Sequence, residues 1–247
     1  MTHSKLLLAI CLLLPAASQA AIQSRAISKI REESVMDALK LPVRERQKAL
    51  AEMPDAAYDS LLTISNDQNR MMSMRWRALT SAALLRKQKA VPDLLKASKS
   101  EEWFMRNAAL LGLSEFSAEQ ALNVGRRLVK DPALVVRSAA VDVLLKHGGQ
   151  RERELLWSEI DAAYNKRSGR SLWIRGQIAK GLASQPRDGE LALFSNLLKE
   201  KEEEIQIASV QGLEKLTKVK LGDAGVSRPR LVQMWRNYFN RPASELR

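Results

Sequence analysis

The sequence is short of the residues that most often carry catalysis and metal binding. Its 247 residues include one cysteine and two histidines, and only 5% of them are aromatic. We find no glycine-rich phosphate loop, no H-E-x-x-H motif and no G-x-S-x-G motif. The content of 45% hydrophobic and 28% charged residues, spread along the chain, argues against a disordered chain and against a protein with several membrane spans.

The first twenty residues resemble a secretory signal. Lys5 precedes the apolar run Leu6–Leu14, and Pro15–Ala20 is rich in small residues. The run is too short for a stable membrane span, which needs about 20 residues. We expect cleavage after Ala20 and export to a bacterial periplasm. The alternative is that the segment is retained, in which case the protein is anchored to the membrane.

Cleavage after Ala20 would remove Cys11 and leave His147 as the single histidine. Such a chain cannot use a cysteine nucleophile, form a disulfide, build a Cys/His zinc site or run a reaction that needs two imidazoles. We therefore expect no catalytic residue, no metal and no cofactor. What remains is a basic protein, with a formal net charge of +12 for the full sequence.

The body of the sequence repeats a pattern in which an apolar residue and usually an arginine begin a run of alanine and leucine at helical spacing. The clearest copies place Arg106, Arg137, Arg175 and Gln206 at the same position, with separations of 31, 38 and 31 residues. A period of 20 to 50 residues is typical of solenoids. We expect these arginines to bond within the repeats instead of binding a ligand.

Each repeat is predicted to contain two helices. One helix carries an apolar stripe at i, i+3, i+4, i+7 and i+8, namely Val136, Ala139, Ala140, Val143 and Leu144. Asp131-Pro132 is predicted to begin this helix, and Gly148-Gly149 to end it. Trp103 and Trp173 are expected in the core or between repeats. No segment alternates with a period of two, so we expect no sheet.

The segment Lys130–Ala140 resembles the HEAT-repeat family in its short bacterial form, in which an Asp-Pro turn leads into Val-Arg-x-x-Ala. The resemblance covers Ser73–Lys218 and extends to Leu41 if Val43-Arg44 begins a further copy. It implies an all-α fold, a right-handed superhelical solenoid of antiparallel helix pairs with about five repeats. Gln206 and the seven-residue insertion depart from the pattern.

The predicted organisation has four parts. These are the signal peptide 1–20, a lead-in segment 21–40 without repeat character, the solenoid 41–218, and a linker with a capping helix in 219–247. The cap is predicted from an aromatic and apolar stripe at helical spacing, which consists of Leu231, Met234, Trp235, Tyr238 and Phe239.

The insertion is the best candidate for a binding element, because insertions in solenoids often lie on the binding face. It falls within Asn165–Ser171 and carries three cations and a glycine. The helix that begins near Arg151 is predicted to place Arg153, Trp157 and Tyr164 on its flank, and these residue types are enriched at interfaces. The alternative is a solvated linker that binds nothing. The candidate binding residues are Arg126, Arg127, Lys130, Arg153, Trp157, Tyr164, Lys166, Arg167 and Arg170.

We expect an exported, non-catalytic scaffold that binds a protein partner with an acidic surface. A second hypothesis is a binder of an anionic polymer such as lipopolysaccharide, cell-wall glycan or nucleic acid. A third is a cell-wall enzyme with two carboxylates about 5 to 10 Å apart, but the sequence offers no such pair. No small-molecule cofactor is expected, and no stable membrane span after signal cleavage.

Overall fold

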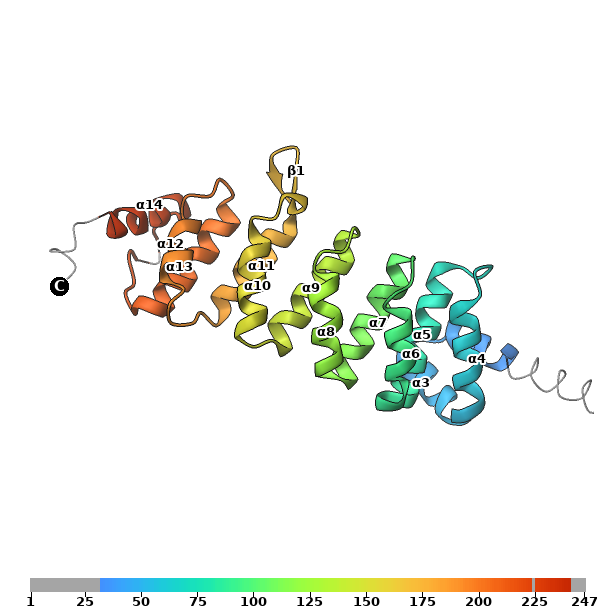
Figure 1. The fold of residues 1–247 in the computed structure, drawn as a ribbon. Helices are drawn as coiled ribbons and strands as arrows, with labels where there is room; N and C mark the ends of the chain where they lie inside the picture. The colour runs from blue at the N-terminus through green and yellow to red at the C-terminus, as the bar shows by residue number, and fades with distance from the viewer. Residues whose placement is uncertain (1–31, 224, 241–247) are drawn as a thin grey trace, which may run out of the picture. The chain divides into compact units, whose positions relative to one another are not determined.

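The computed structural model describes residues 32–223 and 225–240, and most of these residues are in α-helices (Figure 1). The predicted signal peptide lies outside the described residues. None of the helices in the described part of the chain is both long and apolar enough to cross a membrane. The chain divides into two units, Met1–Ser117 and Ala118–Arg247.

The first unit consists of helices joined by short turns. Residues 32–40 are helical. The elements that follow are α3 (Val43–Ala51), α4 (Pro54–Asn66), α5 (Met72–Arg86), a 3-10 helix (Lys87–Ala90), α6 (Val91–Ala97) and α7 (Trp103–Phe116). Helices α4 and α5 pack together, and α7 packs against both α5 and α6.

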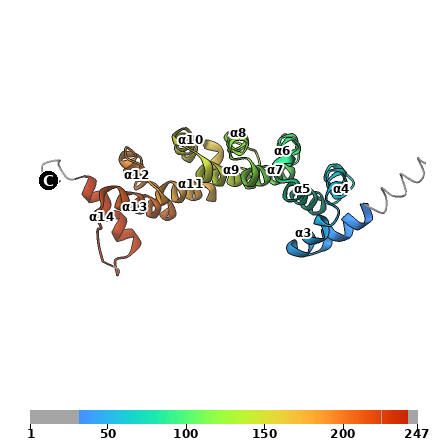
Figure 2. The same ribbon diagram turned by 90° about the horizontal axis from the view of Figure 1, so that it is seen from below.

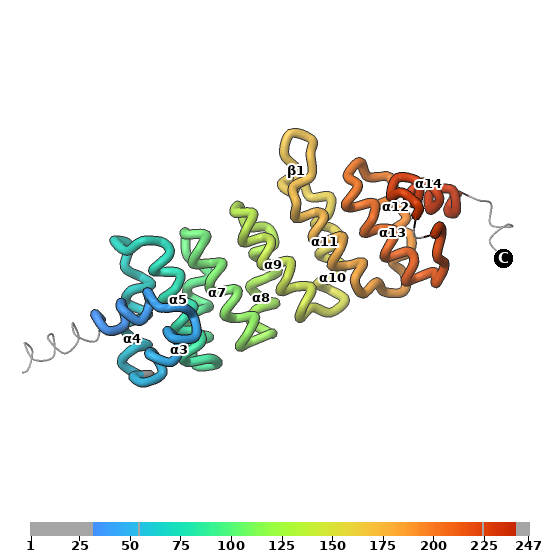
Figure 3. The backbone as a smooth tube through the Cα atoms, turned by 180° about the vertical axis from the view of Figure 1, so that it is seen from behind, coloured from blue at the N-terminus to red at the C-terminus, as the bar shows by residue number. Residues whose placement is uncertain are grey.

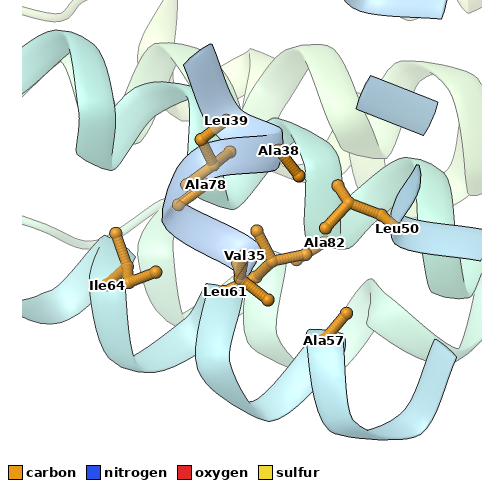
Figure 4. Close-up of a cluster of buried hydrophobic side chains, with 9 residues drawn as sticks. All are labelled: Val35, Ala38, Leu39, Leu50, Ala57, Leu61, Ile64, Ala78 and Ala82. Carbon is orange, nitrogen blue, oxygen red and sulfur yellow. The ribbon is translucent and has the colours of Figure 1, made fainter. Parts of the chain in front are cut away.

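Residues 32–40, the described part of the lead-in segment, contribute to the first unit's core. Val35 and Leu39 are fully buried, and they belong to one cluster with Leu50, Leu61 and Ala82 from α3, α4 and α5 (Figure 4). The helix at 32–40 therefore covers the apolar surface that the first helix pair would otherwise expose, which is the role of a terminal cap in a solenoid.

The suggested repeat copy at Val43-Arg44 is wrong in register. Val43 is 55% exposed and Arg44 is exposed, whereas the arginines of the later copies are buried, as are the equivalent apolar residues from Met105 onward. Arg46 is the buried arginine of α3. Because α3 has only nine residues and packs under the 32–40 helix, its buried face is set by this cap and not by the repeat.

The second unit continues the alternation of helices. Its elements are α8 (Ala118–Leu128), α9 (Leu134–His147), α10 (Gln150–Ile160), a 3-10 helix (Ala163–Asn165), the strands β1 (Lys166–Arg167) and β2 (Arg170–Ser171), α11 (Trp173–Ser184), α12 (Leu191–Leu197), α13 (Glu203–Thr217) and α14 (Arg228–Phe239). Within this unit α8, α10 and α12 lie along one side and α9, α11 and α13 along the other (Figure 2).

The predicted helical stripes are confirmed. The five apolar residues predicted on one face of α9 are all buried, with exposures between 0% and 8%. Close packing extends to glycine: a Cβ added at Gly212 on α13 would lie 2.7 Å from the ring of Phe194 on α12. These observations confirm the all-α helical solenoid as the fold class.

Two local expectations are wrong. Helix α9 begins at Leu134 and not at Pro132, because the carboxylate of Asp131 accepts the backbone N–H of Ala133 at 2.9 Å and closes a turn before the helix. The expectation of no sheet is also wrong, because β1 and β2 form a two-stranded antiparallel pair. Strands of two residues are too short to produce a period-two pattern in the sequence.

The predicted stripe at the C-terminal end lies on α14, which packs against α13. Trp235 is fully buried, and its ring lies 5.4 Å from that of Tyr238 and 5.9 Å from that of Phe239. Arg236 donates its Nε to the carbonyl of Leu198 at 2.9 Å. Helix α14 is thus held by an aromatic cluster and by a bond to the residue that follows α12.

Candidate functional site

The repeat arginines of the first unit are used inside the protein. Arg75 on α5 is 5% exposed, donates its Nε to the carbonyl of Ser65 at 2.9 Å and pairs with Glu102. Arg106 on α7 donates to the carbonyls of Ser100 at 2.9 Å and Glu101 at 2.7 Å. Arg75 therefore satisfies a carbonyl group in the last turn of the preceding helix, and Arg106 satisfies carbonyl groups of the turn before its own helix.

The repeat arginines of the second unit have the same role. Arg137 donates to the carbonyls of Asp131 at 2.7 Å and Pro132 at 3.2 Å. Arg175 is 1% exposed and donates to the carbonyl of Ile160 at 2.6 Å, and it pairs with Glu200 at 3.0 Å. The expected structural use of these arginines is confirmed.

Two predicted binding residues belong to a buried cluster. Arg153 on α10 donates its Nη2 to Glu190 at 2.7 Å and to the carbonyl of Leu182 at 2.7 Å. The indole of Trp157 donates to the same Glu190 at 2.9 Å and packs edge-on against Phe194 at 4.8 Å. These two side chains join α10 to the helix pair α11 and α12, so we leave them out of the candidate surface.

The predicted binding cations on α8 and in the turn after it differ in their exposure and in their distances to acidic residues. Arg126 pairs with Glu152 at 2.7 Å, and Lys130 lies 3.8 Å from Glu159. Arg127 is exposed. Because Glu152 and Glu159 are on α10, the first two of these cations also serve to join neighbouring helices.

The insertion forms a β-hairpin that projects from the N-terminal end of α11 (Figures 1 and 3). In the register of the two strands, Arg167 lies opposite Arg170 and Lys166 lies opposite Ser171. Ser168 and Gly169 form the two-residue turn, with φ values of 50° and 74°. A turn with positive φ at both central residues matches the twist of a hairpin, and glycine is one of the residues that favours it.

The base of the hairpin is held by bonds from several elements. Asn165 is fully buried and donates its side-chain amide to the carbonyl of Glu159 at 2.9 Å, and its own carbonyl accepts the N–H of Leu172 at 2.9 Å. The N–H of Ser171 donates to Glu202 at 3.2 Å. These bonds fix the hairpin against α10 and against the turn that precedes α13.

Tyr164 adds a further anchor at the base. Its hydroxyl donates to Glu159, and the guanidinium of Arg137 lies 5.6 Å from the centre of its ring. Burial and the bond to Glu159 raise the pKa of Tyr164 above its ordinary value, so the hydroxyl stays protonated. Tyr164 lies in the 3-10 helix after α10, and not on α10 as predicted, because α10 ends at Ile160.

The tip of the hairpin presents two guanidinium groups without acidic partners. Arg167 and Arg170 are exposed, and neither side chain makes a hydrogen bond or ion pair with another described residue. Lys166 lies 3.8 Å from Asp161; the side chain of Lys166 is 39% exposed and that of Asp161 is 73% exposed, so solvent screens this contact. Among the nine predicted residues, Arg167 and Arg170 are the cations whose side chains have no hydrogen bond or ion pair in the part of the chain that the structure describes.

One residue of this region was missed. Trp173 begins α11 shortly after β2 and is 53% exposed, and Trp103 at the start of α7 is 41% exposed, so of the two expected places, the core and between repeats, the core is wrong. The sequence did offer a signal for this exposure, because both tryptophans follow a turn and occupy the first residue of a helix. The side chain at that position points away from the buried stripe, which begins one residue later with Ile174 and Phe104.

We define the hairpin surface as Tyr164, Lys166, Arg167, Arg170 and Trp173. It combines cations with two exposed aromatic residues on a braced support. In the part of the chain that the structure describes, no group of histidine, cysteine and acidic residues is placed to hold a metal ion.

Comparison with known proteins agrees with this architecture. Residues 58–145 match the family of HEAT repeats. This segment of the chain contains HEAT repeats. No curated protein matches the chain. The matched segment ends at residue 145, before the hairpin, so the family match describes the repeats and leaves the insertion unassigned.

Proposed function

We propose that the protein is an exported, non-catalytic scaffold that binds an acidic surface of a partner protein through the hairpin surface. HEAT repeats commonly mediate protein interactions, which supports a scaffold. The proposal adds the position of the contact, the charge of the partner and the cell envelope as the compartment.

The observation that carries the proposal is the pairing of Arg167 with Arg170 across the hairpin. Like charges directly opposite each other destabilise a strand pair. In the free protein no described acidic group relieves this repulsion. A carboxylate between the two guanidinium groups would relieve it and would accept two-pronged hydrogen bonds.

The aromatic residues beside these cations favour a protein over a polymer. Tyr164 is 42% exposed and Trp173 is 53% exposed. Tyrosine, tryptophan and arginine are the residue types enriched at the energetic centres of protein interfaces. The strong positive charge of the chain, +12 overall, supports the second candidate, an anionic polymer such as lipopolysaccharide.

The test compares two double charge reversals. Arg167→Glu with Arg170→Glu removes the hairpin cations, and Lys220→Glu with Arg230→Glu makes the same change in charge at two exposed positions that have no partner among described residues. We expect the tagged hairpin variant to lose its main acidic partner in a pull-down from periplasmic extract, identified by mass spectrometry. The control variant should retain it.

Two results would contradict this assignment. Equal capture by both variants would remove the hairpin from the interface. Binding to lipopolysaccharide that depends on the hairpin cations and falls steeply with salt, without a captured protein, would replace the partner protein with a polymer.

Export has a separate test. The signal-like features of Met1–Ala20 support it. We expect the protein in the periplasmic fraction, with an N-terminus at Ala21 by mass spectrometry. A full-length chain in the cytoplasmic fraction would contradict export, and a full-length chain in the membrane fraction would indicate an uncleaved anchor.

A further inference from the structure

The first unit contains a groove that is separate from the hairpin surface. It lies between α3 and α5 and has a volume of about 400 Å³. Its lining includes the apolar residues Leu50, Leu84 and Leu85, and Gln47 and Lys87 add polar groups. Leu84 is 41% exposed, so part of the apolar lining faces solvent. The volume falls within the range of about 300 to 1,000 Å³ for ligand sites.

The groove is bordered by cations. Arg44 and Lys48 are on the same face of α3 as Gln47 and Ala51, both of which line the groove, because residues three and four apart share a helix face. The side chains of Arg44, Lys48 and Lys87 make no hydrogen bond or ion pair with another described residue. The acidic residues of α3 and its C-terminal end are Glu45 and Glu52.

The backbone at Lys87 is unusual for a residue with a side chain. Its φ is 50° and its ψ is −121°, directly after the end of α5. Non-glycine residues adopt positive φ in only a few per cent of cases. This conformation places a lysine at the groove, at a position where glycine would relieve the strain.

We propose that this groove binds an amphipathic helix of a partner protein, with apolar side chains seated on the leucines and acidic side chains beside the lysines and Arg44. Arg44 and Lys48 are one helical turn apart, and this spacing matches carboxylates at i and i+4 on a facing helix. A single lipid headgroup would present one anionic centre. Docking of an apolar helix face into a groove is a recurring mode of peptide recognition.

The inference does not depend on the hairpin. The groove and the hairpin belong to different units, and no residue is shared between them. A protein with a defective hairpin surface should still bind the helix, so the two proposals fail independently.

The test uses a fluorescent synthetic peptide that forms an amphipathic helix of about four turns, with leucine at every third or fourth position and glutamate on the flanks. A peptide with lysine in place of glutamate and a permuted peptide of the same composition are the comparison ligands. Binding to the full protein is measured by fluorescence anisotropy. We expect the glutamate peptide to bind and both comparison peptides to bind at least about tenfold more weakly.

The variants separate the groove from the rest of the unit. Leu84→Glu and Lys87→Glu should each raise the Kd of the glutamate peptide by about tenfold or more, because each removes a contact of the groove. Leu111→Glu is the matched control, since Leu111 on α7 in the same unit is 42% exposed. Circular dichroism confirms that each variant is folded.

Three outcomes would overturn the proposal. The first is that the glutamate peptide binds no better than the permuted peptide, or that Leu84→Glu and Leu111→Glu reduce its binding equally. Binding of vesicles of anionic phospholipid that needs Leu84, without binding of the peptide, would make the occupant a lipid. A dimer in sedimentation that Leu84→Glu dissociates would make the occupant a second copy of this chain.

Discussion

The buried ion pair between Arg153 and Glu190 gives the sharpest prediction for stability. Its side chains are 9% and 8% exposed. Glu190 also accepts the indole N–H of Trp157 at 2.9 Å and the backbone N–H of Arg187 at 2.8 Å. Removing one partner of a buried pair costs about 3 to 5 kcal/mol, because the other charge stays buried without compensation. We expect Glu190→Gln to lower the free energy of unfolding by about 3 kcal/mol, the low end of this range, since an amide retains some of the bonds.

A double-mutant cycle separates the pair from its surroundings. Arg153→Met removes the cation and fills a similar volume, and the double variant with Glu190→Met leaves no buried charge at the site. Replacing a buried pair by apolar residues is often close to neutral. We therefore expect the double variant to be more stable than the sum of the single changes implies, with a coupling energy of at least about 2 kcal/mol.

The pair should also make stability depend on pH. Burial raises the pKa of Glu190, but the bonds from Arg153, Arg187 and Trp157 outweigh burial and hold it below its ordinary value of 4.5. A carboxyl with a depressed folded pKa stabilises the fold at pH values above its unfolded pKa, and this contribution is lost as pH falls through the folded pKa. The difference in stability between the wild type and Glu190→Gln should therefore shrink below about pH 4.5.

The assay is urea unfolding followed by circular dichroism, with hydrogen exchange of α10 and α12 as the local measurement. Exchange in these two helices should accelerate in Glu190→Gln more than exchange in helices α4 and α5 of the other unit. A loss below about 1 kcal/mol at neutral pH, or a coupling energy near zero, would refute the reasoning. Either result would mean that water or other groups compensate the remaining charge.

Three further predictions concern single positions. Gly212→Ala should cost about 1 to 3 kcal/mol in urea unfolding, because its Cβ would meet the fully buried ring of Phe194 at 2.7 Å; an unchanged midpoint would show that the ring can move. Lys218→Gly should stabilise the fold by up to about 1 kcal/mol, because Lys218 ends α13 with a φ of 59°; a lower midpoint would contradict this. Arg170→Thr should raise thermal stability slightly, by about 0.2 to 1 kcal/mol, because it removes the like charge opposite Arg167, and it should weaken partner capture; a clear loss of stability would instead make Arg170 a structural residue.

The repeats could be predicted because the residues that mark equivalent positions in the copies have the same structural role, which is to satisfy backbone carbonyl groups. Arg106 and Arg137 both satisfy carbonyl groups five and six residues earlier in the chain. Gln206, where the arginine is absent, donates to the carbonyl of Glu200, which is also six residues earlier. This local contact places the same kind of residue near the start of each of these helices, so the copies can be recognised without the structure.

The candidate site was less predictable, because burial at its positions is set by contacts between distant segments. Arg153 and Glu190 are 37 residues apart, and nothing near Arg153 in the sequence marks it as buried. The helix at 32–40 contacts the cluster of Leu61 and Ala82 through an apolar face too short to show a repeat. The hairpin was found as an insertion, but its strands were not, since a tight turn at Ser168 and Gly169 leaves only two residues in each strand.

The insertion changes the surface without changing the repeat. Arg75 donates to the carbonyl of Ser65, ten residues earlier, in the last turn of α4, and Arg175 donates to the carbonyl of Ile160, fifteen residues earlier, at the end of α10. The same contact between an arginine and the preceding helix therefore forms across loops of different length. The bond from Arg175 to Ile160 already joins α11 to α10 without the tip of the hairpin. Packing between these helices therefore does not explain the two guanidinium groups at the tip. Their cost to the free hairpin is consistent with selection for binding.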